Sequence, residues 1–255
     1  MENDWSQSLT HPIRLVATDM DGTLTQQGKF TPILFEALER LASINIPVII
    51  VTGRSAGWVE AIAHYLPIAG AIAENGGLYF AKPDSDPDIL VPIPDLRTHR
   101  QNLAAAFRAL QETFPHVREA NDNRFRLTDW TFDVKGLSQA DLRRMHQICQ
   151  QKGWGFTYST VQCHIKFSQQ EKATAVQVVL QRYFPDIEPN EIVTVGDSPN
   201  DESLFNSAVF PNAIGVANVR EYSDRLTHFP KTLTPSPEVQ GFLELAQSLQ
   251  AHSPS

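Results

Sequence analysis

The amino-acid sequence predicts an α/β fold, in which a parallel sheet forms the core and a smaller α+β unit is inserted into it. Two observations support this prediction. Short apolar runs alternate with helical segments near both ends of the chain, and turn-forming residues follow each run, as in parallel strands joined by helical crossovers. Between these parts, each helix is followed by a pair of strands. The sequence therefore predicts a core over residues 1–81 and 168–255 and an αββαββ insert over residues 82–167.

The core elements are identified by the spacing of their apolar residues. The first strand, over residues 13–17, is a mainly apolar run of the length expected for a buried parallel strand. The next helix has apolar residues three or four positions apart, and Pro32 suits its first turn. By the same criteria, strands are predicted over residues 47–51, 69–73, 192–195 and 213–216, and helices over 29–43, up to about 65, and over 171–184, 199–205 and 237–249.

The predicted insert consists of helices and strand pairs. Its helices each have one apolar face, and the triplet Asn121–Asn123 is typical of a turn between two strands. The predicted elements are a hairpin of 78–80 with 89–93 joined by a proline- and aspartate-rich loop over 82–88, a helix over 97–114, strands over 117–120 and 124–134, a helix over 138–152, and strands over 155–159 and 161–167.

Composition restricts the function classes. The chain has 255 residues, 42% hydrophobic and 20% charged, which is ordinary for a globular protein. The net charge of −8 argues against nucleic acid or an anionic membrane as a partner. Residues 1–10 do not have the pattern of a signal peptide, and no apolar run approaches the roughly 18 residues of a membrane span. Cys149 and Cys163 have no metal-binding spacing. We therefore expect a cytoplasmic protein with unpaired thiols, present as a monomer or a weak homo-oligomer.

The first strand ends in two carboxylates, Asp19 and Asp21, followed by Gly22. Ligands of α/β folds bind beyond the carboxyl ends of the strands, and glycine allows the chain to turn sharply there. Crowded carboxylates repel one another unless a cation or a shared proton relieves them, and Mg²⁺ with oxygen ligands is the simplest relief. Taken alone, the same residues are equally compatible with an ordinary acidic turn.

Other polar residues are predicted at the same edge of the sheet. They lie at strand ends or helix starts, and they are Thr52, Lys172, Asp197 and Asp201. A lysine and a hydroxyl can hold phosphate oxygens, a carboxylate can attack phosphorus, and a metal ion offsets the charge of the substrate. The combination therefore indicates phosphoryl transfer, with a small phosphorylated metabolite as the partner.

Four segments resemble the ordered motifs of the haloacid dehalogenase-like phosphatases. They are D-M-D-G-T at 19–23, T-G-R at 52–54, Lys172, and G-D-S-P-N-D at 196–201. The insert is similar to the C2-type cap of the subclass that contains the Cof-type sugar phosphatases. The resemblance covers nearly the whole chain, and it implies a three-layer, Rossmann-like core.

The resemblance also implies residue roles. Asp19 would be the nucleophile that forms an aspartyl-phosphate, and Asp21 the general acid and base. Mg²⁺ would be held by the Asp19 side chain, the Asp21 main-chain carbonyl and Asp197. Asp201, with Asn200, would support the metal site or ligate through water. Thr52, with Gly53, and Lys172 would bind the phosphoryl group.

Several residues keep two interpretations. Arg54 suits either a substrate contact or a salt bridge. Asn75, in the Glu74–Gly77 segment, belongs either to a simple turn or to a substrate contact near the domain junction. His164 and Lys166 alternate on a predicted strand, and we expect them to be structural or exposed rather than substrate ligands.

We therefore expect Mg²⁺-dependent hydrolysis of a small phosphate monoester, a sugar phosphate, with the insert selecting the substrate. The alternatives are a phosphomutase and a non-catalytic sugar-phosphate sensor on the same scaffold. Phosphomannomutases share a similar first motif but have a longer glycine-rich metal loop than this chain. Sucrose-phosphatases usually carry asparagine where Gly22 stands. Intact Asp19 and Asp21 argue against a sensor, because binding alone needs no nucleophile.

Overall fold

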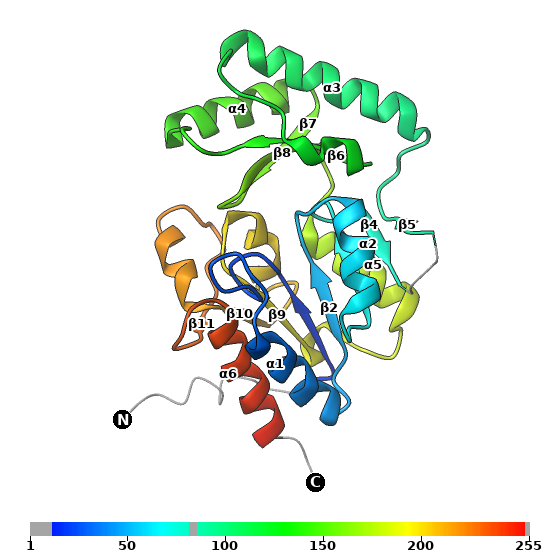
Figure 1. Cartoon of the computed structure of the whole chain (residues 1–255), viewed down its shortest axis with the longest axis vertical. Helices are drawn as coiled ribbons and strands as arrows, with labels where there is room; N and C mark the ends of the chain where they lie inside the picture. Colours follow the sequence, from blue (N-terminus) through cyan, green and yellow to red (C-terminus); the bar gives the residue numbers. More distant parts are fainter. Residues whose placement is uncertain (1–11, 82–85, 253–255) are drawn as a thin grey trace.

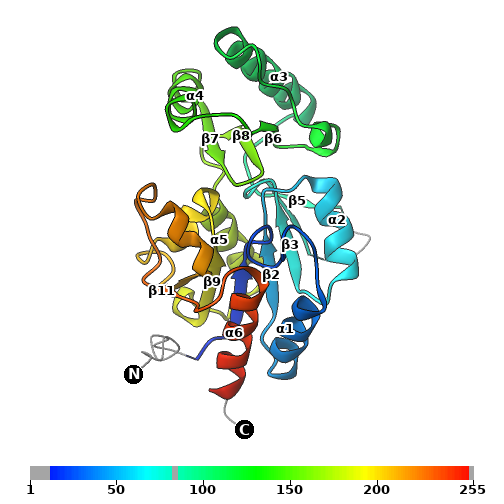
Figure 2. The same cartoon turned by 60° about the vertical axis from the view of Figure 1, so that its left-hand side comes forward.

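The computed structural model describes residues 12–81 and 86–252 and contains two sheets (Figure 1). The larger sheet has eight strands in the order β11-β10-β9-β1-β2-β3-β4-β5, and the smaller has three in the order β6-β8-β7. The smaller sheet lies above the larger one, with its two helices on the side away from it (Figures 1 and 2). The predicted loop over 82–88 and the assessment of residues 1–10 fall largely outside the described residues.

The larger sheet is parallel through most of its width. The strand β1 pairs in parallel with β2 on one side and with β9 on the other, while β4 and β5 are antiparallel to their neighbours. The strands are β1 Leu15–Thr18, β2 Val48–Val51, β3 Gly70–Ala73, β4 Leu78–Phe80, β5 Asp88–Ile89, β9 Ile192–Gly196, β10 Asn212–Gly215 and β11 Thr232–Leu233.

Helices cover both faces of this sheet, which gives the three layers that the sequence predicted. Val16 packs into a cluster with α1 (Pro32–Ser43), α2 (Ala56–Tyr65) and α6 (Glu238–Ala251). Leu15 and Ala17 point the other way and pack with α5 (Lys172–Tyr183). Successive residues of a strand face opposite sides, and each side here is covered, which explains why β1 and β2 are apolar without alternation.

The smaller sheet has its own apolar cluster. Its strands are β6 Asp129–Asp133, β7 Trp154–Tyr158 and β8 Gln162–Phe167, and its helices are α3 Leu96–Thr113 and α4 Gln139–Gln151. One cluster of buried residues joins both helices to the sheet, including Leu103, Phe107, Phe132, Met145 and Ile165.

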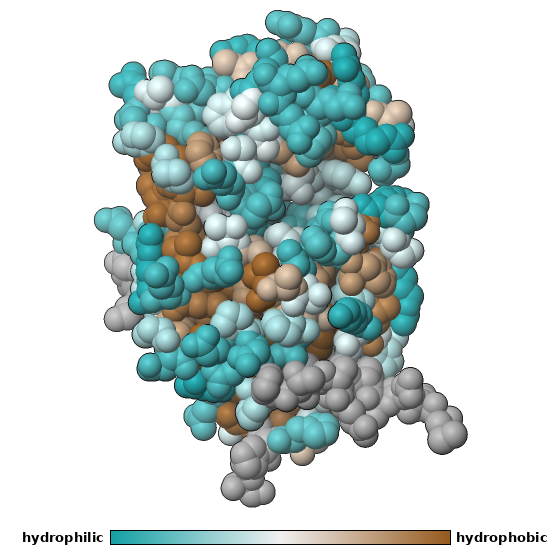
Figure 3. Space-filling model, turned by 180° about the vertical axis from the view of Figure 1, so that it is seen from behind, coloured by the Kyte–Doolittle hydropathy of each residue, from teal (hydrophilic) through white to brown (hydrophobic). Residues whose placement is uncertain are grey.

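Seen from behind, the molecule is largely hydrophilic, with hydrophobic residues gathered mainly along one edge (Figure 3).

The predicted strand over 117–120 is wrong. Only an isolated bridge between Glu119 and Phe132 forms there, and residues Asn121–Phe125 form the 3-10 helix η2. The reason is Asn123, whose buried amide donates to the carbonyls of Ala120 and Thr131 and accepts from the amide of Thr131. The triplet is therefore anchored on β6 instead of turning between two strands.

Other elements differ less from prediction. The strand β5 is short and pairs with β4 in the larger sheet, although it lies within the range assigned to the insert. The helix predicted at 199–205 is the 3-10 helix η4 Pro199–Phe205, and the 3-10 helices η3 Pro189–Glu191 and η5 Ala217–Tyr222 were not predicted. No helix among the described residues is long and apolar enough to span a membrane.

Candidate active site

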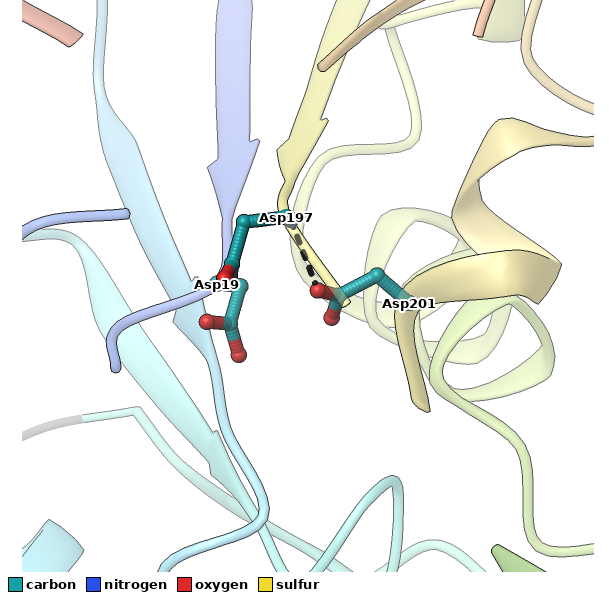
Figure 4. Close-up of side chains that lie close together, drawn as sticks. All are labelled: Asp19, Asp197 and Asp201. Carbon is teal, nitrogen blue, oxygen red and sulfur yellow. Dashed lines mark hydrogen bonds between the residues drawn. The ribbon is translucent and has the colours of Figure 1, made fainter. Parts of the chain in front are cut away.

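The central strands of the larger sheet bring the predicted residues to one edge. Asp19 follows β1, Thr52 follows β2 and Asp197 follows β9. Since these strands run in parallel and in register, their carboxyl ends lie side by side. Figure 4 shows Asp19, Asp197 and Asp201 grouped beyond the strand ends.

These aspartates form a crowded acid cluster, which we define as Asp19, Asp197 and Asp201. Each offers a carboxylate oxygen, and the three oxygens lie within 4.8 Å of one another. Burial raises the pKa of Asp19 to about 8, and the charge of Asp201 adds to this effect while Lys172 opposes it. Burial likewise raises the pKa of Asp197 well above its ordinary value, with the charge of Asp19 adding to it. Protein groups alone thus do not fully neutralise the negative charge of these carboxylates.

Lys172 neutralises part of this charge. Its Nζ lies 2.5 Å from Asp19 Oδ1 and 2.6 Å from Asp201 Oδ1, and the side chain is fully buried. Burial lowers the pKa of Lys172, but the two carboxylates raise it more, so that the ammonium stays charged. Three carboxylates and one ammonium leave two negative charges when all are ionised. A divalent cation with oxygen ligands fits this donor set.

Asp201 also shapes the turn after β9. Its Oδ2 accepts hydrogen bonds from the backbone amides of Asp197 and Ser198, both at 3.0 Å, so it caps η4 (Figure 4). A side chain at Gly196 would place Cβ 2.6 Å from Cβ of Asp201, which explains the glycine. Since Lys172 occupies its other oxygen, Asp201 holds the positions of Lys172 and Asp197.

Gly22 and Asn218 hold Asp197 from the opposite side. Gly22 has a φ of +85°, and a Cβ there would lie 2.4 Å from Asp197 Oδ2. Asn218 donates to that same oxygen at 2.9 Å and to the Gly22 carbonyl at 3.1 Å. Sequence reasoning missed Asn218, because it lies in the unpredicted helix η5 and belongs to no motif.

Asp21 lies outside the acid cluster and forms an ion pair with Arg54. Arg54 donates from Nε to Oδ2 at 2.7 Å and from Nη2 to Oδ1 at 2.6 Å. The guanidinium also lies 4.6 Å from the ring centroid of Trp58. The hydrogen bond to Asp21 raises the pKa of Arg54. Of the two interpretations of Arg54, the salt bridge is present, and a substrate contact stays a prediction.

Asn75 and Asn200 are in contact. Asn200 Nδ2 donates to Asn75 Oδ1 at 3.0 Å, and Asn200 Oδ1 accepts from Ser198 Oγ at 2.7 Å. Asn75 has a φ of +54°, and a Cβ on Gly53 would lie 3.1 Å from its Nδ2. Asn75 Nδ2 is buried and has no hydrogen-bond partner in the described structure. Gly53, Asn75 and Asn200 follow β2, β3 and β9, respectively, and therefore pack together at the ends of these strands.

A cavity of about 20 Å³ lies between the two sheets. Its floor includes Asp19, Asp21 and Arg54, and its roof is formed by residues of β8 and of the turn before it, namely Ser159, Val161, Gln162 and His164. Such a volume holds about one water molecule. In this arrangement the cavity is therefore too small for an organic phosphate. Sequence reasoning did not single out the roof residues other than His164, and no motif marks them.

Buried polar contacts join the two sheets beside this cavity. The Glu74 carboxylate accepts from the amides of Ala56, Leu127 and Thr128 and from the Thr128 hydroxyl, at 2.6–3.1 Å. Burial raises the pKa of Glu74. We define the upper region as residues 90–167, which contain the smaller sheet and its helices. Arg126 of this region donates to the Gly53 carbonyl at 3.0 Å. These contacts hold the roof over the strand ends.

Comparisons with known proteins agree with this architecture. A family model described as haloacid dehalogenase-like hydrolase matches residues 16–89. A phosphoglycolate phosphatase of Methanothrix thermoacetophila is 30% identical over 81% of this chain and 85% of that protein. One of Archaeoglobus fulgidus is 28% identical over 92% of this chain and 96% of its own length.

Solved structures extend the likeness to the inserted region. The crystal structure of Thermoplasma acidophilum 0175 superposes with a TM-score of 0.71 at 22% identity, covering 94% of this chain and 99% of that one. The sucrose-phosphatase from Synechocystis, solved with sucrose and phosphate, gives a TM-score of 0.70 at 14% identity, covering 94% and 98%. The protein belongs to the haloacid dehalogenase-like hydrolases, and the family predicted from the four motifs is confirmed.

Proposed function

We propose that this protein is a Mg²⁺-dependent phosphatase that hydrolyses a small sugar phosphate through an aspartyl-phosphate on Asp19. The observation that carries the proposal is the acid cluster with Lys172 at the strand ends, placed beside Thr52. The family and its phosphatase relatives support the enzyme class: the chain is a hydrolase that acts on phosphoric monoesters.

Asp19 is the proposed nucleophile. Lys172 holds its Oδ1, which leaves Oδ2 for attack on phosphorus, and the side chain lines the cavity. Mg²⁺, held by Asp19, the Asp21 carbonyl and Asp197 with Asp201 in support, would supply the charge that keeps these carboxylates ionised and offsets phosphoryl charge. Thr52 and Gly53, with Lys172, bind the phosphoryl oxygens.

Asp21 is the proposed acid and base. In the first step, the Asp19 oxygen bonds to phosphorus, the ester P–O bond breaks, and Asp21 gives its proton to the leaving oxygen. In the second, Asp21 takes a proton from water as the water oxygen attacks phosphorus, which releases phosphate and restores the Asp19 carboxylate. Arg54 binds both oxygens of Asp21 and thereby fixes the position of this carboxyl group.

The upper region is the proposed cap, which opens and closes over the strand ends. The small cavity supports this role, because a substrate can enter only after the roof moves away. The connection at residues 168–170 follows β8 directly and is a proposed hinge, where Gln170 donates to the Thr128 hydroxyl at 3.1 Å. The other proposed hinge, at Lys82, lies outside the described residues.

A panel of phosphate esters tests the function. We expect release of phosphate that stops with a chelator and returns with Mg²⁺, and faster turnover of sugar and polyol phosphates than of phosphoglycolate, the substrate in the names of the curated relatives. A bisphosphate substrate should yield free phosphate rather than a mutase product. Full activity in chelator, or none with any ester, would refute the proposal.

A further inference from the structure

The roof of the cavity faces the part of the substrate that the strand ends do not bind. Core residues handle the phosphoryl group, which all candidate substrates share. Discrimination must therefore come from roof side chains with hydrogen-bonding capacity left over. The polar roof residues are Ser159, Gln162 and His164, and their existing partners show which of them are available.

Both polar atoms of Gln162 already have a partner. Its Oε1 accepts from Arg126 Nη2 at 3.0 Å, and its Nε2 donates to Asp122 Oδ1 at 3.3 Å. Arg126 is equally committed, because Nη1 donates to Gly53 O and Asp129 and Nη2 also donates to Asp122. Its remaining Nε is fully buried. This network therefore braces the roof through groups that are already paired, and it makes Gln162 a weaker candidate for a ligand contact than His164.

His164 is available on one side of its ring. Its Nδ1 lies 2.8 Å from Asp129 Oδ2, and the His164 side chain is almost fully buried. Burial opposes ionisation of Asp129, but Arg126 and His164 lower its pKa, so the carboxylate is an acceptor. Burial, with the charges of Arg126 and Lys166, lowers the pKa of His164, while Asp129 opposes this shift. The ring is then neutral with the proton on Nδ1, and Nε2 is an acceptor.

Nε2 is the ring nitrogen that is left for a ligand. It makes no hydrogen bond among those of the described residues, and it is not among the fully buried unpaired atoms, although the ring itself lines the cavity. Ser159 adds a donor, because its Oγ accepts from the amides of Val161 and Gln162 and its hydroxyl donates to no group of the described residues. An acceptor and a hydroxyl complement a hydroxyl-bearing leaving group.

The same surroundings disfavour a carboxylate. Asp19 and Asp21 already line the floor, and Arg54, the cation lining this cavity among the described residues, is paired with Asp21. A second anionic group on the substrate would meet these acids and the lone pair of Nε2. Burying a charge without a partner is costly.

We propose that His164 Nε2 accepts a hydrogen bond from a hydroxyl of the leaving group, and that it thereby selects phosphate esters of neutral polyhydroxy compounds over those of hydroxy acids. This role rests on the proposed phosphatase function and specifies its substrate class. Asp129 is the positioning residue that fixes the tautomer of His164. The roof thus recognises the leaving group through His164 Nε2, and Asp129 of the smaller sheet fixes the orientation of this ring.

Kinetics of His164→Phe give the first test. The substrates are glycerol 3-phosphate, phosphoglycolate and p-nitrophenyl phosphate, with Mg²⁺. The variant should lose about tenfold in kcat/KM for glycerol 3-phosphate, mainly through KM, since one hydrogen bond is removed. Its kcat/KM for p-nitrophenyl phosphate should change less than about threefold, because this leaving group has no hydroxyl and so loses no hydrogen bond to His164. His116→Phe, at an exposed position of the upper region, is the matched control and should leave the ranking unchanged.

Nitrogen NMR of ¹⁵N-histidine-labelled wild-type protein gives a second test that does not depend on a variant being active. The His164 signals, assigned by their absence from His164→Phe, should show a protonated Nδ1 and an unprotonated Nε2 at neutral pH. A proton on Nε2 overturns the inference, as does an unchanged substrate ranking in His164→Phe or a wild-type preference for phosphoglycolate. Wild-type inactivity towards every ester instead refutes the phosphatase proposal itself.

Discussion

The two sheets each hold a buried polar cluster, and the clusters differ in how their charges are matched. The acid cluster of the larger sheet crowds three carboxylates around one ammonium. In the smaller sheet, Arg126 lies 2.9 Å from both Asp122 and Asp129, and Asp129 also binds His164. Crowded like charges favour a cation and reactivity, whereas matched partners fix geometry. The lower cluster is therefore suited to chemistry and the upper one to holding the roof.

The comparison predicts its largest effect at Asp19. Asp19→Asn should lower kcat by at least about 10³-fold while the fold is kept, because the amide has the same shape but is a poor nucleophile. Asp133→Asn, an exposed acid of β6, should leave kcat unchanged. Phosphate release and trapping of the phosphorylated protein measure the difference. A labelled phosphoryl group on any other residue would contradict the assignment.

Arg54 should give a smaller loss. Arg54→Ala removes the fork that holds both oxygens of Asp21, and misplacing a proton donor should reduce kcat/KM by about 10- to 100-fold. Arg124→Ala removes an exposed arginine of the upper region that stacks on Phe125, and it should cost little. Equal losses in both variants would show that Arg54 does not position Asp21.

Glu74 tests how the two regions are joined. Glu74→Gln keeps the shape but turns an amide donor towards the backbone amides of Ala56, Leu127 and Thr128. The free energy of unfolding should fall by about 2 kcal/mol, as expected when a buried charged hydrogen bond is lost. Glu36→Gln breaks an exposed pair with Arg40 and should cost less than about 0.5 kcal/mol. Denaturant unfolding measures both, and equal values would argue against a junction held by Glu74.

The acid cluster should also make stability depend on pH when metal is removed. In the folded protein, burial and then Asp201 raise the pKa of Asp19 from 3.8 to about 8. The folded state then keeps a proton that the unfolded state releases, so stability should fall as pH rises through this window. In EDTA, we therefore expect Tm to decrease steadily as pH rises from about 5 to about 8.

Two controls define that effect. Mg²⁺ should raise Tm more at pH 8 than at pH 5, because a cation binds the ionised carboxylates. Asp19→Asn cannot titrate at this position and should reduce the slope, while Asp197, whose pKa burial also raises, still contributes to it. A slope that is unchanged in this variant, or an equal gain from Mg²⁺ at both pH values, would locate the titration elsewhere.

The sequence by itself determined the larger sheet and the residues at its edge. Continuous apolar runs identified β1, β2 and β9, since strands buried on both faces carry no alternation. The acids that follow them had to converge, because parallel strands end at one edge. Short segments of the sequence were therefore enough to predict that Asp19, Thr52 and Asp197 lie together at this edge.

Only the tertiary structure decided the roof. His164 meets Asp129 because β6 pairs with β8, and a contact between residues so distant in sequence leaves no local spacing to recognise. Asn123 likewise anchors on β6 a triplet that was predicted to turn between two strands, and Asn218 reaches Asp197 from η5. A local pattern records which face of an element is buried, but the partner of a buried polar group depends on where the rest of the chain places it.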